Sequence, residues 1–239
     1  YRKGEISEEE LLALEEESCP SAGSCQGMYT ANTMACLSEL MGMSLPYCAS
    51  SSAVSSKKRR IAFESGIQIV ELVKQNLKPS DIITRESLRN AIIADLALGG
   101  STNTFLHILA IANAGNINIT LNDFEELSKQ IHQIVKINPS STLTMADFHN
   151  AGGVPAVLKA LDKHLTDGKT VSGFTTKEIA KQAYKDDSII PNYDKSSYTE
   201  AGLAVLYGNL AKDGCVIKTS GVAPECRTFE GVAKTFDSE

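Results

Sequence analysis

The sequence predicts a mainly helical protein whose final part turns to β-strands, and three observations support this. Apolar residues recur at helical spacing through roughly the first 165 residues. Most of these stretches open with a Ser or Thr and close with a Gly, the usual caps of helices. Beyond the turn Asp167-Gly168-Lys169 this periodicity gives way to short runs of strand character. We therefore place a domain boundary in the range 170–195.

The first helix is predicted to follow Ser7, which forms a capping-box pattern with Glu10. A Pro and a Gly within residues 19–24 then break it. After Gly27, apolar residues recur at helical spacing up to about Met41, which predicts a second helix.

A Ser-rich loop, residues 50–56, precedes a third helix expected near Ile61 to Leu77. The basic run 57–60 lies at its start. We interpret this run as the solvated opening of the helix, in preference to a targeting or phosphate-binding patch.

The same start and stop signals predict six further helices. They are expected from Thr84 to Leu98, after the corner at 99–102, after Thr120, after Thr144, from Val154 to Leu165, and after Thr175.

Two runs near the end, Leu203–Tyr207 and Cys215–Thr219, have strand character and are separated by a glycine-bounded stretch. Residues 229–236 also read as strand material. Because the chain opens on Tyr1 rather than Met and stops within this run, we expect an internal fragment cut at both ends.

Composition excludes several function classes. Hydrophobic residues make up 42% and charged residues 22%, as in ordinary globular proteins. A net charge of -6 argues against a nucleic-acid partner, since phosphate binding needs clustered Lys and Arg. No run approaches the length of about 18 apolar residues that a membrane span needs. Six cysteines in a chain of 239 residues without a secretion signal favour reduced thiols, with or without a metal centre, over a disulfide scaffold.

Cys25 is the main candidate for chemistry. It lies between Gly23 and Gly27 in a sterically open loop just before a predicted helix start, and a helix start stabilises a thiolate. Cys19, six residues earlier, fits neither zinc nor ferredoxin spacing. Spacing alone therefore leaves a metal ligand and a buried thiol both open, and it favours the buried thiol.

Other polar candidates are weaker. Cys36 falls on an apolar helix face and is predicted to lie in the core, and the remaining cysteines have no partner pattern. Backbone N–H groups of the corner at 99–103 can hold a carboxylate or phosphate, but an ordinary helix–helix corner with a Ser/Thr cap is favoured. His107 and His149 are expected to be structural and His132 and His164 to lie on the surface.

Several strings closely resemble the dihydroxy-acid dehydratases, members of the dihydroxy-acid/phosphogluconate dehydratase family. Residues 19–34 (CPSAGSCQGMYTANTM) resemble the cysteine signature, and 42–46 (GMSLP) follow at the family's distance. Three further stretches resemble other blocks of the family: 97–107 (ALGGSTNTFLH), 147–158 (DFHNAGGVPAVL) and 202–211 (GLAVLYGNLA). Four blocks in the family's order along nearly the whole chain make a chance match very improbable.

The resemblance implies an α/β fold in which two domains are represented. Residues 1–180 would be the helix-rich latter part of an N-terminal, cluster-binding α/β domain. Residues 181–239 would be a linker and the first strands of a C-terminal β-barrel domain.

The resemblance also implies an iron–sulfur cluster held by three cysteines, of which Cys25 matches one and two lie upstream. A [2Fe-2S] cluster is favoured and [4Fe-4S] stays open. Cys19 matches no ligand and is treated as a structural neighbour. The family's Mg²⁺ ligands and its catalytic-base serine lie upstream or downstream of this chain, so no catalytic residue is expected here. The Ser101-Thr102-Asn103 turn is expected to help line the site.

The implied reaction is the dehydration of 2,3-dihydroxy-3-methyl acids to 2-keto acids, a hydro-lyase step of valine and isoleucine (also leucine and pantothenate) biosynthesis. The fragment would be incomplete for catalysis. A sugar-acid (6-phosphogluconate-type) dehydratase and a non-catalytic thiol-containing domain are the alternatives. We expect a small-molecule substrate, neither nucleic acid nor membrane as partner, a homodimer at full length, and a bacterial cytoplasmic setting, with organelle targeting left open.

Overall fold

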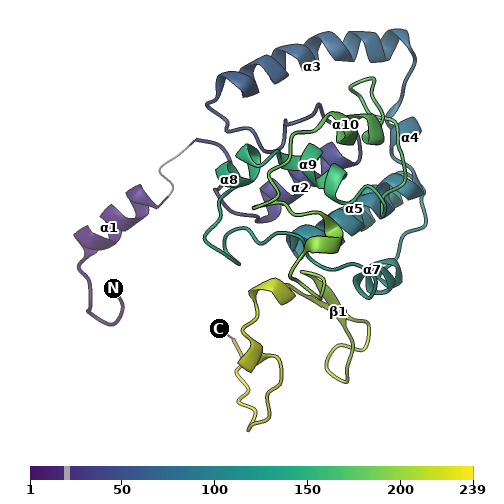
Figure 1. The fold of residues 1–239 in the computed structure, drawn as a ribbon. Coiled ribbons are helices and arrows are strands. Elements are labelled where there is room, and N and C mark those ends of the chain that lie inside the picture. The colour runs from purple at the N-terminus through teal and green to yellow at the C-terminus, as the bar shows by residue number, and fades with distance from the viewer. Residues whose placement is uncertain (19–21, 239) are drawn as a thin grey trace.

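The computed structural model describes residues 1–18 and 22–238, and the core of its helical part lies around one central helix. This helix, α5 (Arg85–Leu98), buries eleven of its 14 residues. Three others pack directly on it (Figure 1): α2 (Thr30–Leu40), α6 (Asn103–Ala114) and α7 (Leu121–Ser128). The core therefore forms around α5, whose buried residues are mostly apolar and include the polar Ser87, Asn90 and Asp95.

Further helices extend this core. α9 (Gly153–Ala160) packs on α2, and α10 (Thr176–Gln182) packs on α9. The other helical elements are α1 (Glu8–Glu17), α3 (Ser56–Lys74), α4 (Pro79–Ile82), α8 (Met145–Asn150) and three 3₁₀ turns at Tyr193–Lys195, Thr219–Gly221 and Pro224–Cys226. None of the described helices is long and apolar enough to cross a membrane.

The helix starts predicted from sequence are largely confirmed, because they depend on local hydrogen bonds. Four of the cap side chains accept the backbone N–H three residues on: Ser7, Thr84, Thr144 and Thr175. Two boundaries differ. α3 begins at Ser56, five residues before the predicted start, because Ser55 caps it, and α9 ends at Ala160 rather than Leu165.

The two predicted strands form a hairpin. β1 (Ala204–Leu206) pairs antiparallel with β2 (Cys215–Ile217), and these are the strands of the described part of the chain. β1 lies against α7. The structure is thus helix-rich with a small antiparallel sheet, and the β-barrel stays a prediction. Residues 229–236 are exposed and form no strand, so that prediction was wrong: a strand needs a neighbour for its backbone groups.

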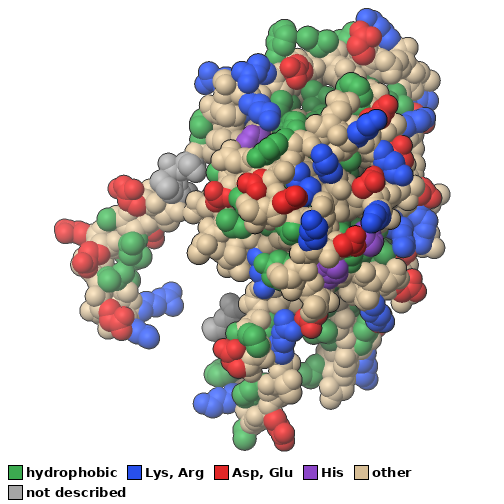
Figure 2. Space-filling view, in the orientation of Figure 1, with side chains coloured by type: hydrophobic (Ala, Val, Ile, Leu, Met, Phe, Trp, Pro, Cys, Tyr) green, Lys and Arg blue, Asp and Glu red, His purple; other side chains and the backbone are tan. Residues whose placement is uncertain are grey.

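α3 exposes an apolar face. Its side chains Phe63, Ile67, Val70 and Val73 are between 51% and 74% exposed, and Figure 2 shows hydrophobic atoms along this helix with basic side chains at its N-terminal end. The basic run 57–60 does open the helix, as predicted. Contiguous exposed apolar surface of this kind usually marks a contact with other protein.

Lys218, directly after β2, fastens the hairpin to the helical core. Its ammonium group donates to the carbonyl oxygens of Gly99 at 2.7 Å, Gly100 at 2.8 Å and Met28 at 3.3 Å. The three acceptors come from the start of α2 and from the corner between α5 and α6. One side chain therefore joins three segments that are far apart in sequence.

Lys218→Met is expected to loosen the hairpin without unfolding the helical core. The substitution removes three hydrogen bonds, each with a net contribution of about 1 kcal/mol, while β1 keeps its contacts with α7. Hydrogen exchange should accelerate in residues 203–221 and stay unchanged in α5. Lys212→Met, on the exposed turn of the same hairpin, is the control. Identical exchange in the two variants would refute the tether.

Candidate functional site

Cys25 lies exposed in the loop that leads into α2. Its thiol makes one weak contact, a 3.8 Å approach of Sγ to the carbonyl oxygen of Gly27. The neighbouring Ser24 and Gln26 are exposed as well. The thiol is therefore accessible to a ligand from the solvent side and is not packed into hydrocarbon.

Two glycines determine the path of this loop. Gly23 has φ +96°, in the left-handed region that favours glycine, and a Cβ there would lie 2.7 Å from Cβ of Ala53. Gly27 is buried, and a Cβ on it would lie 2.6 Å from the ring of Tyr29 and 2.7 Å from the carbonyl oxygen of Asn138. Any side chain at either position would displace the loop.

A third constraint comes from Asn32, which is 4% exposed in the first turn of α2. Its Nδ2 donates to the carbonyl oxygens of Cys25 and Gly27, the latter at 2.7 Å. Its Oδ1 accepts the hydroxyl of Ser24 at 2.6 Å. Both sides of the amide are thus engaged by the loop that carries the thiol.

The start of α6 lies beside the start of α2. The hydroxyls of Thr30 and Ser101 are 3.0 Å apart, and Nδ2 of Asn103 donates to the Thr30 hydroxyl at 2.8 Å. The N-cap residues of the two helices, Tyr29 and Thr102, make no side-chain cap. Two positive helix ends therefore meet next to the Cys25 loop, where they stabilise negative charge.

The corner at 99–103 is a helix–helix corner, as the spacing favoured. Gly99 adopts a left-handed conformation (φ +58°) that ends α5, and Ser101 Oγ accepts the N–H of Asn103 at 3.2 Å. The carbonyl oxygens of the two glycines face Lys218. Whether this turn lines a substrate site stays a prediction.

Asp95 is fully buried beneath this corner. Its Oδ2 accepts the hydroxyl of Thr104, while Oδ1 has no hydrogen-bond partner among the described residues and abuts Gly100. Burial raises the pKa of this carboxyl to about 7, against the lowering effects of the Thr104 hydroxyl and the Lys218 charge. The site thus has an ionisable group directly beneath its glycines.

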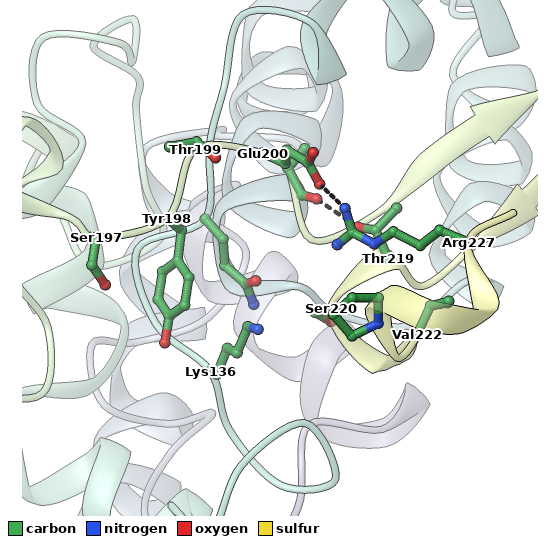
Figure 3. A pocket seen from close by; sticks show the side chains of 12 residues that line it. Lys136, Ser197, Tyr198, Thr199, Glu200, Thr219, Ser220, Val222 and Arg227 are labelled. Atoms are coloured by element: carbon green, nitrogen blue, oxygen red, sulfur yellow. Dashed lines mark hydrogen bonds and ion pairs between the residues drawn. The ribbon is translucent and has the colours of Figure 1, made fainter.

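A polar cavity of about 290 Å³ lies on the side of the corner that faces the C-terminal segment. Figure 3 shows Lys136 and Tyr198 facing each other in it, with the ammonium 5.0 Å from the ring centre. Arg227 reaches Glu200 at 2.7 Å. Ser220 joins the cavity wall to the corner, since a Cβ on Gly99 would lie 3.0 Å from its hydroxyl.

The other described cysteines form no metal-binding group of three or more side chains with Cys25. Cys36 is buried in the core as predicted, and burial together with the nearby Glu39 carboxyl raises the pKa of its thiol well above the ordinary value. The exposed cysteines of the C-terminal segment are Cys215 and Cys226. Cys19 lies outside the described residues.

The histidines follow the predictions only in part. His149 is structural, with Nδ1 2.8 Å from the Ser50 hydroxyl, whereas His107 is exposed and that prediction was wrong. His132 and His164 are not free surface residues, because both rings pack against Tyr193 and are partly buried.

Cys25 fits one ligand position of an iron–sulfur cluster. The donor is a thiol in an open, exposed loop beside the N-terminal ends of two helices. Within residues 1–18 and 22–238, no group of three or more His, Cys, Asp or Glu side chains can hold a metal ion. The further ligands of such a cluster would have to come from outside this described part.

Sequence reasoning missed three residues of this site: Asn32, Asp95 and Lys218. Asn32 lies within the quoted cysteine signature, so its position was visible although its role was not. Lys218 contacts residues more than a hundred positions away, and no local pattern reveals such a contact.

Two family models match the chain. The dihydroxy-acid/6-phosphogluconate dehydratase N-terminal model matches residues 1–179, and the corresponding C-terminal model matches residues 188–239. Proteins named dihydroxy-acid dehydratase are similar along the whole chain. Identity is 51% for the one from Thermodesulfovibrio yellowstonii, 51% for Endomicrobium trichonymphae and 52% for Methanococcus vannielii. Each comparison covers 100% of this chain and 44% of the relative, so the chain spans less than half the length of these relatives.

Asp95→Asn is expected to change the pH dependence of stability. The pKa of Asp95 rises from 3.8 to about 7 on folding, so in this interval the folded protein holds a proton that the unfolded chain has released. The stability that this contributes is complete below about pH 4 and is lost as the pH rises through about 7. The variant should therefore unfold at a higher temperature than the parent near pH 8, and the two curves should converge near pH 4.

Circular dichroism melts across this range test the prediction, with the exposed Asp162→Asn as control. Burial also raises the pKa of Glu39 to about 7, so the unfolding temperature of both proteins falls with rising pH for this second reason. The difference between the two curves therefore reports Asp95 alone. Parallel curves would show that this carboxyl does not titrate in the interval.

Proposed function

The chain belongs to the dihydroxy-acid/6-phosphogluconate dehydratase family, and we propose that the whole protein is a hydro-lyase that converts 2,3-dihydroxy-3-methyl acids to 2-keto acids. The observation that carries the proposal is the exposed Cys25 in a loop fixed by two glycines and Asn32. The names of the three relatives support this substrate class. On this proposal, the dehydration is a step of branched-chain amino-acid synthesis.

Cys25 would hold one iron of an iron–sulfur cluster, with a [2Fe-2S] cluster favoured. When bound, the cluster supplies a Lewis-acidic iron for the departing hydroxyl of the substrate. The chain's own residues prepare this position. Gly23 and Gly27 keep the loop on its path, and the starts of α2 and α6, which meet beside it, would favour an anionic substrate. Mg²⁺ ligands and the base serine would come from outside this chain.

The domain organisation and assembly are part of the same proposal. Residues 1–180 would belong to the cluster-binding domain, and residues 181–239 would lead into a β-barrel domain whose first hairpin is β1–β2. The exposed apolar face of α3 is the kind of surface that contacts other protein, which supports assembly into a homodimer. A small acid is the expected partner at the site, and nucleic acid and membrane are not.

Two alternatives make different predictions. The matching family models are named for 6-phosphogluconate dehydratases as well, so a sugar acid is the competing substrate. Keto-acid formation from the two substrate classes separates them. A non-catalytic thiol-containing domain would bind no iron at all, and thiol titration with and without iron tests for it.

Cys25→Ser is expected to abolish cluster assembly in the polypeptide extended to the length of its relatives. Serine offers a hard hydroxyl that stays protonated at neutral pH, so the iron loses one ligand. Cys226→Ser, which removes another exposed thiol, should retain the cluster. Iron content, visible absorbance and keto-acid formation after anaerobic reconstitution measure the outcome. A normal cluster in the Cys25 variant would overturn the assignment.

The 239-residue chain by itself is expected neither to retain a cluster nor to dehydrate a dihydroxy acid. Cys25 supplies a single ligand, and the described residues contain no group of three or more His, Cys, Asp or Glu side chains that could hold a metal ion. Anaerobic reconstitution, desalting and iron analysis check this, followed by the keto-acid assay. A stable cluster in this chain would mean that its own residues complete the ligand set.

A further inference from the structure

We infer that Asn32 is a positioning residue, which holds the Cys25 loop in the conformation that presents the thiol to iron. The inference rests on the proposed function and deepens it, since nothing else assigns a role to this side chain. Asn32 does not touch the thiol sulfur in the structure. It acts on the backbone on either side of it.

The hydrogen bonds of Asn32 hold the loop at three points. Nδ2 donates to the carbonyl oxygen of Cys25 itself and, at 2.7 Å, to that of Gly27. Oδ1 accepts from the hydroxyl of Ser24 at 2.6 Å. These three residues flank and include the thiol position, and the amide that joins them is 4% exposed on a packed helix. A buried anchor therefore restrains an exposed loop.

The same bonds determine which way the peptide groups face. In a planar trans peptide the N–H points opposite to the preceding carbonyl. Because the carbonyls of Cys25 and Gly27 face Asn32, the N–H groups of Gln26 and Met28 point away from it. The Met28 N–H meets the carbonyl oxygen of Asn138 at 2.7 Å. Asn32 and Asn138 therefore hold this part of the loop from opposite sides.

The thiol of Cys25 contributes little to holding this loop. Its Sγ approaches the carbonyl oxygen of Gly27 only to 3.8 Å, whereas Nδ2 of Asn32 donates to the same oxygen at 2.7 Å. Asn32 is therefore the stronger side-chain donor to the Gly27 carbonyl.

The requirement is specific for asparagine. The position needs two N–H donors and one acceptor at the end of a short side chain, and only an amide supplies both. Aspartate would place an acceptor against two carbonyl oxygens. Leucine has a similar shape and supplies neither donor nor acceptor. With little change in volume, leucine therefore removes all three hydrogen bonds, and aspartate removes the two that Nδ2 donates while it keeps an acceptor for the Ser24 hydroxyl.

The experiment compares Asn32→Leu and Asn32→Asp with Thr33→Val as a matched control. Thr33 is fully buried in the same helical turn and its hydroxyl donates to the carbonyl oxygen of Tyr29 at 2.7 Å, outside the 24–27 loop. The control therefore removes one buried hydrogen bond of the same helix without touching the loop. Ser24→Ala, at an exposed position, is a second variant that leaves the helix intact.

Two measurements are made. In the cluster-free 239-residue chain, hydrogen exchange of residues 22–28 should accelerate about tenfold or more in the Asn32 variants and stay at the parental rate in Thr33→Val. In the polypeptide of the relatives' length, cluster retention after reconstitution should weaken about 10- to 100-fold. Ser24→Ala should show a smaller loss in the same direction.

The outcomes separate this inference from the proposed function. Unchanged loop exchange, or full iron retention in both Asn32 variants, overturns the role of Asn32. Equal losses in Thr33→Val also overturn it, because the effect would then be general destabilisation of α2. If the parent protein binds no iron while loop exchange responds as expected, the proposed function fails and Asn32 remains only the anchor of the loop.

Discussion

The close approach between the start of α2 and the corner that joins α5 to α6 is the constraint on which the rest of the site depends. Gly100 makes it feasible, because a Cβ there would lie 2.5 Å from Cγ2 of Thr33 in α2. The contact is closed by the hydroxyls of Thr30 and Ser101. It places the Cys25 loop beside two helix starts, where backbone N–H groups and helix dipoles favour negative charge.

Two ionisable side chains, Lys218 and Asp95, lie on opposite sides of the glycine corner. Lys218 lies on one side of the glycine corner and satisfies its carbonyl oxygens, and Asp95 is buried on the other side with one oxygen unpaired in the described structure. Burial lowers the pKa of Lys218, while Asp95 raises it. Burying a carboxyl with one unpaired oxygen costs free energy. Ionisable groups that are buried at such a cost cluster at functional sites. Lys218 therefore holds the corner through its hydrogen bonds, whereas the ionised form of Asp95 destabilises it.

Sequence predicted the local features of this arrangement and missed the distant ones. Helix starts such as Thr84 and Thr144 were predictable because a cap bonds its own neighbours three residues away. The open loop at Cys25 was predictable from its flanking glycines. The Lys218 tether was not, since its partners lie far along the chain, and the exposure of His107 depends equally on which helices pack beside it. Burial is a tertiary property, and periodicity reports it only on average.

These contacts separate two roles within the site: one residue carries the thiol, and the others fix its loop. The chain offers one thiol that can bond iron and an extensive set of contacts that fix its loop before any metal arrives. A loop that is already ordered loses little conformational entropy on binding, so more of the metal–thiolate bond energy appears as affinity. Such preorganisation matters most where a single residue must meet ligands supplied by other segments, because an error in its position is not corrected by its neighbours. If Cys25 binds a cluster as proposed, a single thiol in a loop that is already ordered is what such a shared site requires of this part of the protein.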